Sequence, residues 1–294
     1  MKNIKILFVA VFDNEGISTN TSQAKGFADL GHEVFLYNYR VRSALVGGNR
    51  LRDLELIKVC KEIKPELVVF AKCNDMSTNV FLECKKTSTV CYWFPDPLVT
   101  YNYDEYFEKT RAAHIFCCDK KNVLEVAKKY NENSVLIHEG FDLALEKPRN
   151  VIQDINVSFI GNMYGDRNTQ ISQLEIPIKI FSNAFGEKHS EAVSRSKVNL
   201  NFCTDKGASD RVYKILAAGG FLISDDWIGR KDMLEDGKHC VIFKDIKDLK
   251  EKIKYYLSCS DERKKIADQG HEHIQKYSRF EWAKKVVENY HKLV

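Results

Sequence analysis

Two basic side chains stand at the head of an apolar segment, DRVYKILAAGGFLISDD, at residues 210–226. Arg211 and Lys214 are three residues apart, so a helix places them on one face. Ser209 is a preferred N-cap residue, and Asp210 suits the positive end of a helix dipole. The first amides of such a helix, together with a guanidinium, can bind an anion such as a diphosphate. A solvated surface helix is the competing interpretation of the same spacing.

Two other loops supply candidates for the same ligand. The loop FIGNMYGDR, residues 159–167, follows an apolar run; Gly161 lets the backbone approach a ligand, and Asn162 and Arg167 can hydrogen-bond to it. The loop FCTDKGAS, residues 202–209, also follows an apolar run, and we expect it to form a wall of the same pocket. A plain turn with a surface arginine is the alternative for 159–167.

Asp96 has the setting of a general base. It follows an apolar run in YWFPDP, and prolines on both sides restrict the backbone and project the carboxylate. A carboxylate in that position can take the proton from an attacking hydroxyl group. A turn-capping aspartate is the alternative interpretation.

The elements that must position these residues are alternating apolar runs and amphipathic stretches, a pattern typical of parallel sheets with helices on both faces. The predicted strands of the first half lie within 4–11, 32–39, 66–72, 89–94, 114–118 and 134–139. Those of the second half lie within 155–162, 176–182, 197–202, 220–226 and 239–245. Helices are predicted at 51–63, 121–129, 210–218, 249–257, 261–277 and 280–293, with Gly219-Gly220 ending the helix at 210.

The predicted fold class is therefore α/β, with two Rossmann-like doubly wound domains and a cleft at the carboxyl ends of their strands. The polar segment 141–154, which contains Pro148, is interpreted as a linker. We predict an N-terminal domain at 1–145, a C-terminal domain at 146–275, and a last segment at 276–294 that returns to the N-terminal domain.

Composition limits the alternatives. The chain has 294 residues, long enough for two cores, and 45 basic side chains against 41 acidic ones give a net charge of +4, which permits an anionic ligand without demanding nucleic acid. Nine cysteines without a C-x-x-C pair predict reduced thiols and a cytoplasmic location. The apolar N-terminus is interpreted as a buried strand and not as a signal peptide. No metal site is predicted, since a helix would point His271 and His273 to different faces.

One long segment resembles the nucleotide-sugar domain of GT-B glycosyltransferases, specifically the CgeB-like group. It begins with SRSKVNLNFCTDKGASDRVYKILAAGGFLISDD and continues to about residue 258. The resemblance extends through DERKKIADQGHEHIQKYSRFEWAKKV, and more weakly to KPELVVFAKCND, TVCYWFPDP and HEGFDLALEKP in the first half. The DNA β-glucosyltransferase of T-even phages is similar more distantly. The resemblance implies a GT-B fold and a nucleoside-diphosphate-sugar donor, with no further cofactor.

The resemblance also assigns roles. Arg211 matches the family's arginine that contacts the donor diphosphate, whereas Lys214 stands where the family has a ribose-binding glutamate. Lysine has no acceptor for a ribose hydroxyl, so Asp210 or a backbone carbonyl is expected to replace it, and Lys214 to meet phosphate or an acidic sugar. Asp96 resembles the catalytic base of the phage enzyme.

In GT-B folds the loop after the first strand, here 12–19, lies between acceptor and donor. Gly16 and Ser18 are thus expected near the sugar, and Asp13 is a second candidate base.

We therefore expect a cytoplasmic, metal-independent glycosyltransferase that moves a sugar from a nucleoside-diphosphate sugar to an acceptor hydroxyl. The acceptor can be a glycan, a lipid-linked sugar or a small molecule. A second hypothesis is a DNA-modifying enzyme acting on a hydroxymethylated base, which the phage resemblance and the predicted basic loop 37–52 favour. A third, suggested by the missing glutamate, is a catalytically silent sugar-nucleotide-binding or structural protein.

Overall fold

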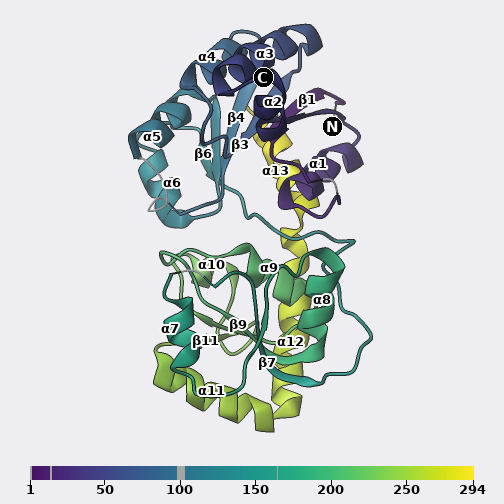
Figure 1. The fold of residues 1–294 in the computed structure, drawn as a ribbon, viewed down its shortest axis with the longest axis vertical. Helices are drawn as coiled ribbons and strands as arrows, with labels where there is room; N and C mark the ends of the chain where they lie inside the picture. Colours follow the sequence, from purple (N-terminus) through teal and green to yellow (C-terminus); the bar gives the residue numbers. More distant parts are fainter. Residues whose placement is uncertain (1, 14, 98–102, 164) are drawn as a thin grey trace. The chain divides into compact units, whose positions relative to one another are not determined.

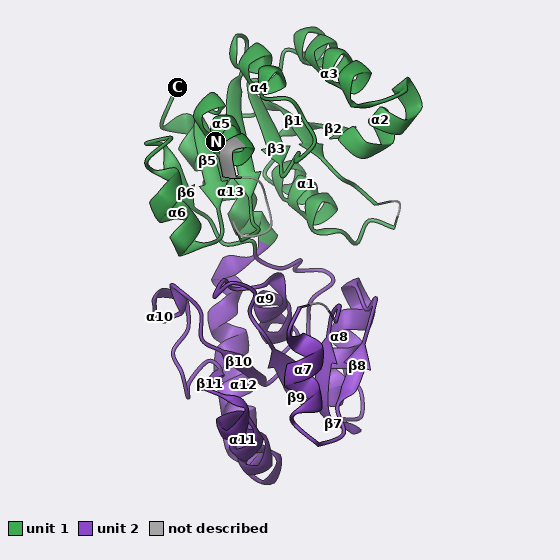
Figure 2. Ribbon diagram, turned by 60° about the vertical axis from the view of Figure 1, so that its left-hand side comes forward, with its two compact units in different colours: residues 1–139, 279–294 green, residues 140–278 purple. Residues whose placement is uncertain are grey.

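The computed structural model describes residues 2–13, 15–97, 103–163 and 165–294. The chain packs as two compact units (Figure 2): unit 1 is Met1–Glu139 with Arg279–Val294, and unit 2 is Gly140–Ser278. The last segment belongs to unit 1, and the divisions fall at 139/140 and 278/279 rather than at the expected 145/146 and 275/276. The expected linker at 141–154 belongs to unit 2, where Phe141 is buried and bridges to Ser278.

Unit 1 is built on a six-stranded sheet in the order β2-β1-β3-β4-β5-β6 (Figure 1). Every neighbouring pair is parallel. The strands are β1 (Lys5–Ala10), β2 (Glu33–Asn38), β3 (Leu67–Ala71), β4 (Thr89–Phe94), β5 (Ile115–Cys118) and β6 (Ser134–Leu136). The helices are α1 (Thr19–Asp29), α2 (Tyr39–Val46), α3 (Asn49–Ile63), α4 (Thr78–Lys85), α5 (Tyr103–Ala112), α6 (Lys121–Ala127) and α13 (Arg279–His291).

Unit 2 repeats the plan with a five-stranded parallel sheet in the order β11-β10-β9-β7-β8. The strands are β7 (Ile155–Ile160), β8 (Lys179–Phe181), β9 (Ser196–Asn201), β10 (Leu222–Asp225) and β11 (Val241–Phe243). The helices are α7 (Arg167–Ser172), α8 (Gly186–Arg195), α9 (Asp210–Ala217), α10 (Arg230–Met233), α11 (Ile246–Ser258) and α12 (Ser260–Ile274), the last followed by a 3₁₀ turn, Gln275–Tyr277. Each predicted apolar run coincides with one of the eleven strands of the described residues, although β9 begins one residue before its run, at Ser196, so the α/β fold class is confirmed.

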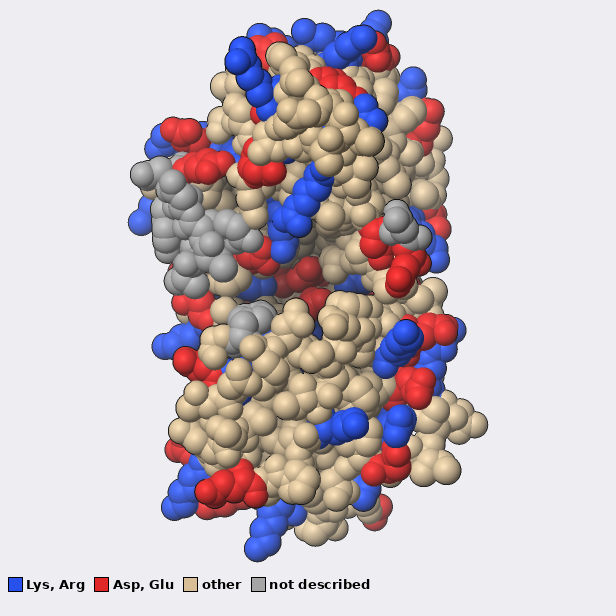
Figure 3. Space-filling model, viewed as in Figure 1, with Lys and Arg blue, Asp and Glu red and all other residues tan. Residues whose placement is uncertain are grey.

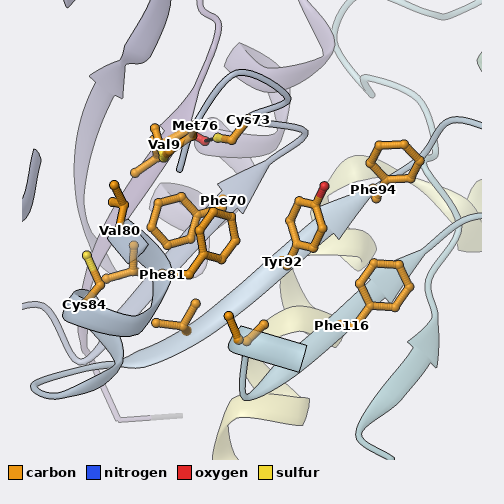
Figure 4. Packing of buried hydrophobic residues seen from close by; sticks show 14 of the residues in the cluster. Val9, Phe70, Cys73, Met76, Val80, Phe81, Cys84, Tyr92, Phe94 and Phe116 are labelled. Carbon is orange, nitrogen blue, oxygen red and sulfur yellow. Dashed lines mark hydrogen bonds between the residues drawn. The ribbon is translucent and has the colours of Figure 1, made fainter. Parts of the chain in front are cut away.

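Both faces of the unit 1 sheet are buried, which explains why its strands read as continuous apolar runs. One face packs against α3 to α6; there the Phe70 and Phe81 rings stack with centroids 4.0 Å apart, and Tyr92 meets Phe81 edge-on (Figure 4). The other face packs against α1 and α13, whose Trp282 contacts Phe8. The last helix therefore completes the core of the first unit.

The described residues contain no helix that is both long and apolar enough to cross a bilayer. Seven of the nine cysteines are buried, all are free thiols, and Cys203 and Cys259 are half-buried.

Candidate active site

The strand order of unit 2 reverses between β7 and β9, because β8 follows β7 on one side and β10 follows β9 on the other. Loops that leave two such strands diverge, and the crevice outside their carboxyl ends is where open α/β sheets bind ligands. A cavity of about 200 Å³ opens there. It is lined by the last residue of β7 and by residues that follow β7, β8 and β9, namely Ile160, Gly161, Asn162, Asn183, Ala184, Phe185, His189, Asp210, Arg211 and Lys214.

Arg211 is held rigidly in the wall of this cavity and is 8% exposed. Its Nε donates to the backbone carbonyl of Ile160 over 2.5 Å, and Nη1 donates to Oδ1 of Asn201 over 2.7 Å. The guanidinium carbon lies 4.6 Å from the centroid of the Phe159 ring, a distance suited to a cation–π contact. The guanidinium is thus fixed in the cavity wall by the protein's own groups.

Gly161 is required for this placement. Its φ of +144° is a conformation that side chains rarely adopt, and a Cβ there would lie 2.5 Å from Nη2 of Arg211. The sequence predicted the close approach of a ligand at this glycine; the group that approaches it in the structure is the Arg211 side chain.

Lys214 and Asp210 form an ion pair, with Nζ and Oδ2 2.6 Å apart, and both line the cavity. The Lys214 side chain is only 16% exposed, so the solvated-helix interpretation is wrong. Ser209 occupies the N-cap position of α9 but makes no side-chain cap; its hydroxyl donates instead to Oδ1 of Asn201 over 2.8 Å. Asn201 therefore positions both Ser209 and Arg211.

The helix ends where predicted. Gly219 has a φ of +73°, and its backbone N–H donates to the carbonyl of Leu216. The next position, Gly220, also requires a glycine, because a Cβ there would lie only 2.4 Å from the Val193 side chain.

Arg167 is buried behind the loops and is not among the residues that line the cavity. It donates to the carbonyls of Asn162 and Phe202 and to the hydroxyl of Thr204. Its guanidinium therefore braces the loops that follow β7 and β9, a placement that favours a structural role over the predicted phosphate contact.

Asn183, Phe185 and His189 line the cavity but were not predicted. They lie in and after the β8–α8 connection, and single polar and aromatic residues in a loop carry no spacing signal.

Asp96 lies two residues beyond the end of β4, in unit 1, and forms an ion pair with Lys72, whose Nζ is 2.7 Å from Oδ2. Lys72 directly follows β3 and has a left-handed φ of +61°. This partner was not predicted. A left-handed lysine has no sequence signature, although such strain is concentrated at functional sites.

A second charged group lies along the same sheet edge. The register pairs Phe94 with Cys118 and Cys118 with Leu136, so Asp96, Lys120 and His138 stand at equivalent positions beyond their strands. The buried carboxylate of Asp119 lies 3.2 Å from Lys120 Nζ and 3.5 Å from His138 Nδ1. Burial lowers the pKa of Lys120, but Asp119 and other nearby carboxylates outweigh it and hold this pKa above its usual value.

Asp13 is occupied in its own loop. Its carboxylate accepts hydrogen bonds from the backbone N–H of Ile17 and the hydroxyl of Thr21, each over 3.0 Å. Burial raises the pKa of Asp13, but these hydrogen bonds outweigh it and hold the pKa below its ordinary value. Gly16 is exposed with a φ of +74°, and Ser18 caps α1. The loop is thus self-braced, and Asp13 is the weaker candidate base.

Comparison with known proteins agrees with this geometry. Residues 143–288 match a family described as glycosyl transferase-like. No curated protein matches the chain in sequence. Among solved structures, Anabaena Alr3699/HepE in complex with UDP-glucose has a TM-score of 0.72 at 10% identity, covering 99% of this chain and 100% of that one.

Two further structures show the breadth of the fold. Sucrose-phosphate synthase from Thermosynechococcus elongatus has a TM-score of 0.72 at 10% identity, covering 98% of each chain. An alpha-glucosyltransferase in complex with UDP-glucose and DNA containing an abasic site has a TM-score of 0.64 at 12% identity, covering 98% of this chain and 99% of that one. These likenesses establish the fold, while the CgeB-like group stays a prediction. The chain is a glycosyltransferase of the GT-B fold, with its glycosyl transferase-like domain at residues 143–288.

Proposed function

We propose that the unit 2 cavity binds the diphosphate of a uridine-diphosphate sugar, and that the protein transfers the sugar to a hydroxyl group of a glycan, a lipid-linked sugar or a small molecule. The observation that carries the proposal is the preorganised Arg211 at the strand-order reversal, beside the first turn of α9. A guanidinium and helix amides stabilise the negative charge that develops on a leaving diphosphate, and the proposal assigns that task to them instead of to a metal. UDP-glucose in the HepE structure supports the choice of nucleotide.

Ribose recognition is assigned to Asp210. Lysine at 214 cannot accept a hydroxyl proton, but the ion pair holds the Asp210 carboxylate at the cavity wall, one helical turn before the position of the family's glutamate. In this proposal Lys214 orients Asp210 and adds positive charge for the phosphates.

Lys214→Met should therefore weaken UDP binding by about 1–2 kcal/mol, because it removes a partner of a partly buried carboxylate. Lys214→Glu places two carboxylates one turn apart and should weaken it further. Isothermal titration with UDP and with uridine measures both effects. A Lys214→Met variant that binds UDP as tightly as the wild type would remove Lys214 from the donor site.

The acceptor side is assigned to unit 1, with Asp96 as the proposed base. DNA is a less favoured acceptor. The predicted basic loop 37–52 lies mostly in α2 and α3, and two of its arginines are occupied in ion pairs, Arg42 with Glu55 and Arg52 with Asp53. The DNA-bound neighbour keeps this second candidate in the test below.

A cytoplasmic location is also proposed. The nine free thiols support it, because proteins of oxidising compartments commonly carry disulfides and cytosolic proteins rarely do.

A thermal-shift titration tests the proposal. UDP and UDP-sugars should raise the melting temperature, since ligands that bind only the folded state stabilise it, whereas uridine should not. Release of UDP from the best donor, with and without candidate acceptors that include hydroxymethylated DNA, then distinguishes transfer from silent binding. No shift with any nucleoside diphosphate would refute the donor site.

A further inference from the structure

An exposed apolar surface lies on two consecutive helices of unit 1. Helices α2 and α3 are joined by Gly47 and Gly48, whose φ values of +88° and +126° make the tight turn, and they lie side by side next to the edge strand β2 (Figure 2). Their outward residues include four large aliphatic side chains, exposed by 51 to 68%. These are Val41, Leu45, Leu51 and Leu54. We call them, with the charged residues around them, the α2–α3 surface.

Folding does not explain these side chains. The inner face of the helix pair already supplies the core contacts, through Tyr39 of α2 and through Leu56 and Cys60 of α3. Leu51 and Leu54 lie on the opposite side of α3 from Leu56 and Cys60. Adjacent large aliphatic residues on a surface mark an interaction site, whereas single ones do not.

The charged side chains of α2 and α3 carry a net positive charge. Residues 39–63 hold six basic and three acidic side chains, a net charge of +3 out of the chain's +4. The three acidic residues are each matched to a base, in the pairs Arg42–Glu55, Arg52–Asp53 and Lys58–Glu62. The excess consists of Arg40, Arg50 and Lys61, all exposed. Figure 3 shows Lys and Arg side chains, together with some Asp and Glu, around uncharged surface at the end of unit 1 where α3 lies.

We propose that the α2–α3 surface docks on an anionic lipid bilayer, with the leucines inserted at the level of the headgroups and the arginines against lipid phosphates. Helices with an apolar outer stripe flanked by Lys and Arg bind membranes in this way. The inference goes beyond sugar transfer and does not depend on the donor site, because these residues lie in a different unit from the cavity.

The apolar character decides against nucleic acid as the partner. Phosphate contacts with DNA are made by basic and polar side chains, and leucines at the centre of such a surface would gain nothing from the phosphate backbone. Both kinds of side chain would stabilise binding to a bilayer, because each inserted leucine is removed from water and each arginine contacts an anionic headgroup.

Co-sedimentation with vesicles tests the proposal. The wild-type protein should bind phosphatidylcholine vesicles that contain phosphatidylglycerol, bind pure phosphatidylcholine vesicles less, and lose affinity as salt rises. Leu45→Ser/Leu51→Ser/Leu54→Ser should lower partitioning at least about tenfold. Arg40→Glu/Arg50→Glu should lower it about fivefold or more for each charge removed.

The matched controls are Ile152→Ser, an 85% exposed aliphatic residue of unit 2, and Lys247→Glu/Lys265→Glu, two exposed lysines of unit 2. Both should bind vesicles like the wild type. All variants should keep the wild-type melting temperature and its increase with UDP. The thermal shift with UDP then tests the proposed donor site, and vesicle binding separately tests the proposed membrane surface.

A wild-type protein that ignores anionic vesicles would overturn the proposal, and so would a leucine variant that binds them normally. A leucine-dependent dimer in light scattering without vesicle binding would overturn it in favour of self-association. Salt-sensitive DNA binding that Arg40→Glu/Arg50→Glu abolishes, in the absence of vesicle binding, overturns it in favour of nucleic acid.

Discussion

Arg211→Ala is expected to weaken the binding of UDP by about 1.5–3 kcal/mol, the scale of a hydrogen bond to a charged group, which corresponds to a loss of affinity of more than tenfold. The reason is geometric. The guanidinium is fixed by Ile160 and Asn201 before the ligand arrives, so the Arg211 side chain loses little conformational entropy when the ligand binds. Arg211→Lys should recover only part of the loss, because an ammonium group cannot reproduce the planar set of donors.

The alanine variant also removes internal hydrogen bonds. The Ile160 carbonyl and the Asn201 amide would lose a partner, at a cost to folding of about 1–3 kcal/mol. Melting temperatures must therefore be measured beside the titrations. A destabilised variant that still binds UDP normally would contradict the assignment.

Gly161→Ala gives the same test without removing charge. Its Cβ would overlap Nη2 of Arg211, so the guanidinium must move, and UDP affinity should fall although the arginine remains. Gly165→Ala is the matched control, since Gly165 also has a left-handed φ, of +60°, but a Cβ there meets nothing within 4 Å. Both variants carry backbone strain, and only the first should change UDP binding.

The positions of the strands could be predicted from the sequence because a parallel strand buried on both faces leaves an unbroken apolar run, as in KILFVA and LVVFA. Arg211 and Lys214 could be predicted for a related reason. The helix that carries them starts at a recognisable cap position and ends at Gly219, so the spacing of its residues fixes which side chains share a face.

The parts that could not be predicted depend on tertiary contacts. The roles of Arg167, Ser209 and Asp13 are decided by carbonyls and hydroxyls supplied by other loops. The stretch 37–52 was interpreted as a loop, yet Arg52 is fully buried and paired in α3, because Asp53 and Asp75 lie beside it.

Asp96→Asn is expected to reduce the turnover of sugar transfer by about 10²–10⁴, the usual share of general-base catalysis, while UDP binding stays nearly unchanged. The substitution removes the proton acceptor with little change in volume. The ion pair with Lys72 fixes the orientation of the carboxylate, since Lys72 Nζ and Asp96 Oδ2 are 2.7 Å apart. Lys72→Met should therefore lower turnover as well, because the carboxylate loses the partner that orients it.

Asp13→Asn is the matched control for the same change of carboxylate to amide in the same unit. An amide oxygen can still accept from Ile17 or Thr21, so the loop should survive and turnover should fall by less than about tenfold. If Asp13→Asn is the damaging variant instead, the base is Asp13.

His138, which pairs with Asp119, is a third candidate for the base. A buried carboxylate 3.5 Å from Nδ1 orients an imidazole as in known acid–base pairs, and His138 stands at the same sheet edge as Asp96. His138→Gln with a loss of about 10²–10⁴ beside a nearly normal Asp96→Asn would therefore move the base to His138.

The product anomer, read by NMR, then decides the mechanism. A single displacement with either base must invert the configuration at the sugar, because the acceptor attacks the face opposite the leaving diphosphate. Retention would exclude that mechanism whichever carboxylate proves essential, and Asp96 would then have to act by charge and position instead of by taking the acceptor's proton.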